Sequence, residues 1–129
     1  MNKKLLFTFK LIAAVIMLQT LFYKFSGAQE SIDLFTKVAG ENEAFMRFGT
    51  GFIELFAAIL LFIPKKAWFG AILTIGLMSG AIIAHLTKIG IVHNNDGGLL
   101  FGAAILTFLL ALIILFLERK KLPFIGDKF

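Results

Sequence analysis

The sequence predicts an all-α integral membrane protein built as a four-helix bundle. Four segments consist almost entirely of Leu, Ile, Phe, Ala and Gly, and they cover residues 5–23, 48–63, 67–86 and 99–117. As helices, segments of this length rise by about 24–30 Å, close to the thickness of the hydrocarbon core of a bilayer. With 59% hydrophobic residues and 16 Phe in 129 residues, the chain has too little polar surface for a water-soluble globule.

The first segment, residues 5–23, is predicted to be a membrane span. Lys10 interrupts it, but this side chain lies only about 9 Å from Lys3 along a helix and can extend to the headgroups. The alternative is a secretory signal peptide, because basic residues, an apolar run and the small residues 26–28 also fit that outline. The run is longer than a typical signal core, and bulky Tyr23 stands near the cleavage point, so we prefer a span.

Residues 24–47 connect the first two spans and are predicted to contain a short amphipathic helix at residues 31–38. Ser31 is its expected N-cap, and Gly40 follows its end. The next two spans form a hairpin, since Pro64 ends one and Lys65-Lys66 makes a tight turn before the other. Trp68 then stands at the headgroup level that amphipathic rings prefer.

Small residues recur at four-residue spacing in the third span and at the start of the fourth: Gly76, Gly80 and Ala84, then Gly98 and Gly102. Such strips allow two helix backbones to approach closely. We expect them to pack inside the bundle, with self-association into a homo-oligomer as the alternative.

The distribution of charge predicts the orientation. Nine of the 13 Lys and Arg lie near the two termini or in the turn at residues 64–66, whereas Lys24, Lys37, Arg47 and Lys88 lie toward the other side. The positive-inside tendency predicts a multi-pass protein of the cytoplasmic (inner) membrane with both termini inside, N-in/C-in. We expect residues 1–129 to form a single membrane domain. The basic residues are not gathered with exposed aromatics, so nucleic acid is not an expected partner.

Glu54 is the most informative ionisable residue, because it lies about 9 Å inside the second span. An unpaired carboxylate at that depth is costly, so Glu54 must hold a proton or face a cation. Arg47 is seven residues earlier and lies on nearly the same helix face. Lys24 and His85 stand at the same ends of the first and third spans.

These residues predict one polar pocket that opens outward. Glu54 and His85 are the candidate catalytic residues, because both can exchange protons near neutral pH once their surroundings shift them. The other groups are candidate ligand-binding residues: Lys24 and Arg47 as cations, with Gln19 and Ser79 deeper as neutral hydrogen-bonding groups. Lys88 and Asp96 stand at the rim of this pocket, but they fall in a short polar turn where we expect ordinary solvated roles. An excess of cations suits an organic acid or the oxygens of a quinone. In the alternative interpretation the same charges only bridge helices.

Three short motifs stand in order on the predicted spans: Tyr23-Lys24-Phe25-Ser26-Gly27, Gly49-x-Gly51-x-x-Glu54-Leu55 and Ala84-His85-Leu86. In these motifs the chain resembles the DoxX family, particularly its DoxX-like branch, over residues 5–118. The resemblance implies a small four-helix membrane protein, often bacterial. It points to Lys24, Gly27, Glu54 and His85, and to an association with quinone-reducing thiosulfate oxidoreductase or other membrane oxidoreductase complexes.

The absence of cysteine limits any redox role. The chain has no thiol of its own, and it lacks the motifs for a flavin, a nucleotide or an iron–sulfur cluster. The cofactor is left open, with quinone as the main candidate and haem bound by His85 as a weaker one, and redox work would be shared with a membrane or periplasmic protein. His85 and His93 do not have metal-ligand spacing. The main hypothesis is ligand binding in the outward pocket. The alternatives are a non-catalytic scaffold subunit and a small transporter, and whether the protein is an enzyme is left open.

Overall fold

The computed structural model describes residues 3–91 and 97–119, and within these ranges the chain is all-helical. In chain order the elements are α1 (Lys3–Ser26), α2 (Gln29–Ala39), the short 3-10 helix η1 (Gly40–Asn42), α3 (Glu43–Leu61), α4 (Ala67–Ala84), the π-helical turn η2 (His85–Ile89) and α5 (Leu99–Leu117). Four helical segments are long and apolar enough to cross a membrane. The predicted all-α fold with four spans is confirmed.

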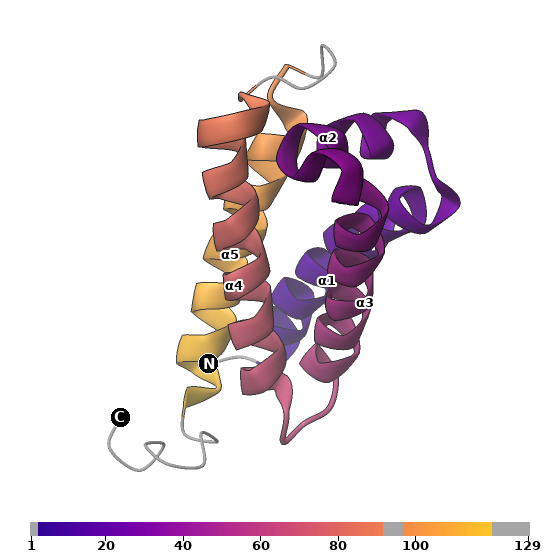
Figure 1. Ribbon diagram of the computed structural model, residues 1–129. Helices are drawn as coiled ribbons and strands as arrows, with labels where there is room; N and C mark the ends of the chain where they lie inside the picture. The colour runs from indigo at the N-terminus through magenta and orange to yellow at the C-terminus, as the bar shows by residue number, and fades with distance from the viewer. Residues whose placement is uncertain (1–2, 92–96, 120–129) are drawn as a thin grey trace.

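The four long helices form a ring in which each packs against two others. α1 contacts α3 and α5, and α4 contacts the same two helices. The start of α1, the turn between α3 and α4 and the end of α5 lie together (Figure 1), and we call this the turn end. α2 lies across the opposite end, which we call the α2 end, and it packs on α3 and η2.

Small side chains allow the four helices to approach closely. The largest cluster of buried residues joins all of them and consists of Ala13, Ala14, Met17, Ala58, Leu61, Ala71, Leu110 and Ile114. α4 comes nearest to α3 at Gly70, where an added Cβ would lie 2.8 Å from both the Ala57 oxygen and the Leu61 nitrogen. Only glycine permits that contact without a shift of backbone.

The short helix α2 is present where the sequence predicts one, but its first turn differs from the prediction. The N–H groups of Ser31 and Ile32 both donate to the Ala28 oxygen at 3.0 Å, so the helix has already begun before Ser31. Ser31 is therefore not the N-cap, and Ala28 holds that position without a side-chain cap. Gly40 ends α2 as predicted, with a positive φ of 59°.

Three spans have different bounds from those predicted, while α5 has the predicted ones. α1 extends from Lys3 to Ser26 and is longer at both ends than the predicted segment 5–23. α3 begins at Glu43, five residues before the predicted start at Phe48. Glu43 in the first turn is favourable at the positive end of the helix dipole, and it pairs with Arg47 one turn later. These two interactions stabilise the first turn as a helix even though it lacks the hydrophobicity of a membrane span. α4 ends at Ala84, and the chain continues as the wider turn η2.

Gly76 and Gly80 of α4 do not pack inside the bundle, and neither does Gly102 of α5, so that expectation is wrong for these three residues. All three glycines are exposed, and no described atom lies within 4 Å of a Cβ built on any of them. Ile72 and Ile83, one turn to either side of the two α4 glycines, are exposed as well. Of the glycines in α4, it is Gly70 that lies against a neighbouring helix, and the spacing pattern did not include it.

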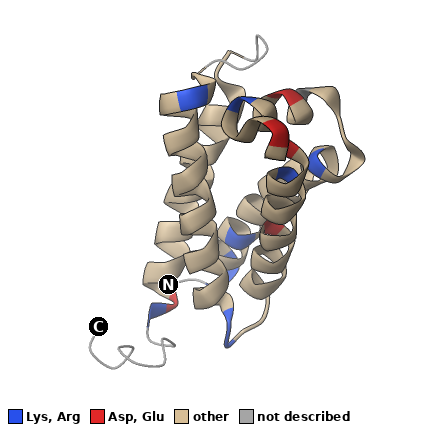
Figure 2. Ribbon diagram, viewed as in Figure 1, with Lys and Arg blue, Asp and Glu red and all other residues tan. Residues whose placement is uncertain are grey.

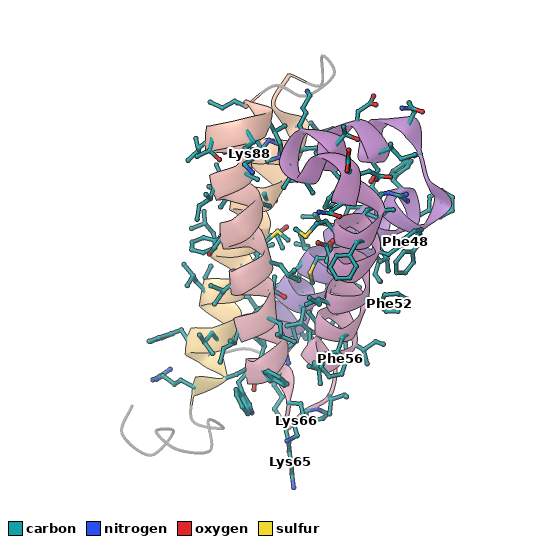
Figure 3. All side chains as sticks on the ribbon, viewed as in Figure 1. Phe48, Phe52, Phe56, Lys65, Lys66 and Lys88 are labelled. Atoms are coloured by element: carbon teal, nitrogen blue, oxygen red, sulfur yellow. The ribbon has the colours of Figure 1, made fainter. Side chains whose placement is uncertain are left out.

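The outer surface of the bundle is apolar. Phe48, Phe52 and Phe56 project from one side of α3 (Figure 3), and Phe52 is 63% exposed. α4 and α5 contain no charged residue between their ends (Figure 2). A surface of this kind is stable in lipid and not in water, which agrees with four membrane-spanning helices.

Candidate functional site

A buried ion pair joins α1 to α3 near the α2 end. The Lys24 Nζ lies 2.6 Å from the Glu54 Oε1, and the Thr20 hydroxyl donates to the Glu54 Oε2 at 3.1 Å. Lys24 and Thr20 are one turn apart on the same face of α1, so both meet the carboxylate from the same side. Glu54 is 2% exposed. Both of its oxygens are engaged, as expected for a carboxylate at this depth.

Arg47 forms a second connection between these two helices, one layer closer to the α2 end. Its Nε donates to the Glu43 Oε2 at 2.9 Å, and its Nη1 donates to the backbone oxygen of Lys24. That oxygen belongs to the last turn of α1, where carbonyls have no partner within the helix. Gly27, with a φ of 71°, turns the chain away directly after this point. Arg47 therefore caps α1 as well as pairing with Glu43.

The charges of this cluster balance. Lys24 and Arg47 are matched by Glu54 and by Glu43, which is half-buried. The sequence predicted more cations than anions at this cluster because Glu43 was not included. The four-residue spacing of Glu43 and Arg47 on one helix is the signal that could have identified this pair. The electrostatic argument for an anionic ligand at this cluster is accordingly weaker.

His85 is buried at the start of η2 but is not joined to the Lys24–Glu54 pair. Its Nδ1 is 2.9 Å from the Gly90 oxygen, and the Gly90 N–H in turn donates to the His85 oxygen at 2.8 Å. The ring also packs edge-on against Phe101 of α5. Within the part of the chain that the structure describes, no hydrogen bond or ion pair links His85 to Glu54. Its contacts close the π-helical turn. The other histidine, His93, and Asp96 lie outside the described residues.

The two neutral residues predicted to line the pocket occupy different surroundings. Gln19 is exposed on the outside of α1, and its neighbour Thr20 makes the contact with Glu54 instead. One residue along a helix turns the side chain by about 100°, which accounts for the exchange. Ser79 is half-buried on α4. The structure thus brings together Lys24, Arg47 and Glu54 of the predicted set.

A groove of about 680 Å³ lies at the α2 end, beside η2. Its lining residues are Val38, Ala39, Asn42, Phe45, Met46 and Lys88. Lys88, labelled in Figure 3, donates from its Nζ to the Val38 oxygen at 3.1 Å and so connects η2 to the last turn of α2. This groove is mostly apolar with one cation, and it is open to the outside.

A second buried ion pair, which the sequence analysis missed, lies toward the turn end. The Lys10 Nζ is 2.9 Å from the Glu118 Oε1, and this carboxylate is as buried as that of Glu54. The signal was a lysine inside the first span and a glutamate directly after the last one, at the same end of an antiparallel bundle. α1 therefore supplies the cation for both buried carboxylates, one in α3 and one after α5.

A comparison with protein families relates the chain to a known family. The model of the family described as DoxX matches residues 5–87, a range that contains Lys24, Arg47, Glu54 and His85. Searches of curated proteins and of solved structures find no match.

Proposed function

The chain belongs to the DoxX family, and from its paired intramembrane charges we propose that it is a non-catalytic membrane subunit that assembles with another membrane protein. The Lys24–Glu54 pair and the Glu43–Arg47 pair hold α1 against α3 in this proposal. The small-residue face of α4 receives a helix of the partner. We further propose the N-in/C-in orientation in the cytoplasmic membrane, on the basis of the basic residues gathered at the turn end.

The observation that carries the proposal is that the buried ionisable groups already form hydrogen bonds or ion pairs within the bundle. Glu54 accepts from Lys24 and Thr20, Arg47 donates to Glu43 and to an α1 carbonyl, and His85 is bonded to Gly90. A proton-transfer site needs a group that can exchange its partner for a substrate. These groups instead bond to one another or to backbone, as expected of charges that fix helix positions.

The outer face of α4 supports the assembly part of the proposal. Gly76 and Gly80 leave a shallow strip between the exposed side chains of Ile72 and Ile83. In lipid there is no hydrophobic driving force between helices, so association depends on close packing over small residues. A transmembrane helix of another protein fits this chemistry.

Native mass spectrometry of the detergent-purified protein tests the proposal. We expect a stoichiometric second protein with the unchanged chain and its loss in the Gly76→Leu/Gly80→Leu variant, because leucine fills the strip. The matched control is Gly102→Leu, since Gly102 is an exposed glycine with open space around it on α5, and it should retain the partner. A wild-type protein that carries a stoichiometric small molecule and no second protein would overturn the proposal.

The groove beside Lys88 favours a second candidate function, the binding of a small amphipathic ligand such as a quinone or an organic acid. Its volume of about 680 Å³ lies in the range of ligand sites, and Lys88 offers one cation beside apolar walls. Because the chain has no cysteine, redox work with such a ligand would need a partner protein. Thermal unfolding with and without a short-chain quinone tests this. A shift that Lys88→Gln reduces supports the site, whereas no shift in the unchanged protein rejects it.

A further inference from the structure

The two ends of the bundle differ strongly in charge (Figure 2). Among the described residues, the half of the bundle at the turn end holds six basic residues and one acid: Lys3, Lys4, Lys10, Lys65, Lys66, Arg119 and Glu118. The other half holds four basic residues and four acids with described side chains: Lys24, Lys37, Arg47, Lys88, Asp33, Glu41, Glu43 and Glu54. One end is therefore strongly positive, and the other is nearly neutral.

The single acid at the turn end does not reduce the charge of its surface. Glu118 is 3% exposed and pairs with Lys10 beneath the surface. The side chains of Lys3, Lys4, Lys65 and Lys66 are exposed. The ammonium groups of Lys3, Lys65 and Lys66 thus give a positive surface over the described part of this end.

The backbone of the turn between α3 and α4 is hydrogen-bonded at the two lysines Lys65 and Lys66. The Lys66 N–H donates to the Ile63 oxygen at 2.9 Å, and the Trp68 indole donates to the Lys65 oxygen at 3.0 Å. Lys65 and Lys66 point away from the helices (Figure 3). The backbone of the turn is already fixed, so the conformational freedom that is lost when the two lysines bind an anion is mainly that of their side chains.

The position of this surface identifies the kind of anion. Exposed apolar side chains lie directly beside it: Phe7 of α1, Phe62 and Ile63 of the turn, and Phe69 of α4. Trp68, half-buried, has the character of a residue at the membrane interface. Cations at the edge of the hydrocarbon core face lipid phosphates before any soluble anion.

We propose that the turn end is a binding surface for anionic phospholipids, whose phosphate groups are held by Lys65 and Lys66 with Lys3 beside them. Each lysine near an anionic membrane surface strengthens binding by about fivefold, so two strengthen it by roughly 30-fold. The surface is separate from the ion pairs of the proposed function, and its test does not depend on them.

Native mass spectrometry with defined lipids tests this proposal. The detergent-purified chain is mixed with equal amounts of phosphatidylglycerol and phosphatidylcholine, and the lipids that remain bound are counted. We expect a preference for phosphatidylglycerol that falls on the order of 30-fold in Lys65→Gln/Lys66→Gln. The control, Lys37→Gln/Lys88→Gln, removes two charges from the α2 end and should keep the preference.

Three further measurements make the result decisive. Circular dichroism verifies that each variant is folded, and Lys3→Gln offers a second reduction of charge outside the turn if the double variant unfolds. Inorganic phosphate in excess should not displace the lipid, because the apolar tails contribute to binding; displacement would mean that free phosphate is the ligand. Equal retention of the two lipids by the unchanged protein, or an equal loss in both double variants, would overturn the proposal.

Discussion

The buried pair between Lys24 and Glu54 predicts an asymmetric response to substitution. Lys24→Met leaves a carboxylate that is almost fully enclosed, with Thr20 as its remaining partner. Loss of one partner of a buried pair costs about 3–5 kcal/mol, so we expect Lys24→Met to reduce the free energy of unfolding by about 3 kcal/mol. Glu54→Gln is expected to cost less, about 1–2 kcal/mol, because an uncharged amide still bonds to Thr20 and the freed ammonium can extend toward the membrane surface.

The double variant separates a structural pair from a ligand site. Lys24→Met/Glu54→Gln contains no unpaired buried charge, so it should be more stable than Lys24→Met alone, with a coupling energy of about 1.5–3 kcal/mol. The free energies come from unfolding in mixed micelles of a mild and a denaturing detergent, followed by circular dichroism at 222 nm. Dyes that detect unfolding through thiols are unsuitable, since the chain has no cysteine.

A comparison at Gln19 controls for general effects of substitution in α1. Gln19 is exposed and next to the Thr20 contact, so Gln19→Met should change the free energy of unfolding by less than about 0.5 kcal/mol. The reasoning fails if Lys24→Met is no more destabilising than Gln19→Met, or if the double variant is less stable than Lys24→Met. Either result would mean that the pair contributes nothing to holding α1 against α3.

Other substitutions test packing, the second ion pair and the orientation. Gly70→Ala should lower the unfolding free energy by about 1–3 kcal/mol, since its Cβ would press on the Ala57 backbone, whereas Gly76→Ala should be neutral or stabilising by up to about 1 kcal/mol in the same detergent titration. Lys10→Met should destabilise by about 1–3 kcal/mol because it removes the ion pair with the buried Glu118 carboxylate, and Lys10→Met/Glu118→Leu should recover part of that loss. A C-terminal fusion to a protein that fluoresces only in the cytoplasm should fluoresce in cells; a dark fusion of normal abundance would reverse the orientation.

The architecture could be predicted from the sequence because a bilayer restricts the choices. Apolar segments of sufficient length must be helices, and the turn at Pro64 requires antiparallel neighbours. The helix ends were less predictable where a helix extends beyond its apolar segment. The first turn of α3 lies between the charged residues Glu43 and Arg47, before the apolar stretch, and hydropathy alone does not distinguish such a turn from a loop.

The site could be predicted only to the level of which charges lie at the same depth. Position along each span placed Lys24, Arg47 and Glu54 near the same end of the bundle, and the structure joins them through contacts of Lys24 with Glu54 and of Arg47 with the Lys24 backbone. The sequence did not determine how far each helix is rotated about its axis. Gln19 was therefore predicted to line the pocket, whereas its neighbour Thr20 makes the contact with Glu54. His85 has the right depth, but its bonds go to Gly90 in its own turn.

The rotation of the helices also explains why the glycine pattern misled. A strip of small residues shows that one face of α4 can accept another helix, but it does not say which helix. Gly70 meets α3 inside the bundle, while Gly76 and Gly80 face outward. Gly76 and Gly80 follow Gly70 by six and ten residues. At about 100° per residue these separations are net rotations of about 240° and 280°, so both glycines lie on a different face of α4 from Gly70.

α1 has a role that no single motif of the chain reveals. Glu54 and Glu118 lie on helices that do not follow each other around the ring, and each takes its lysine from α1. Arg47 adds a bond to the last turn of α1. A bundle of α3, α4 and α5 alone would therefore lack the lysine that pairs with each of these carboxylates and one acceptor of Arg47. Because buried charged groups are costly in lipid, the three helices depend on α1 for their balance of charge as well as for their packing.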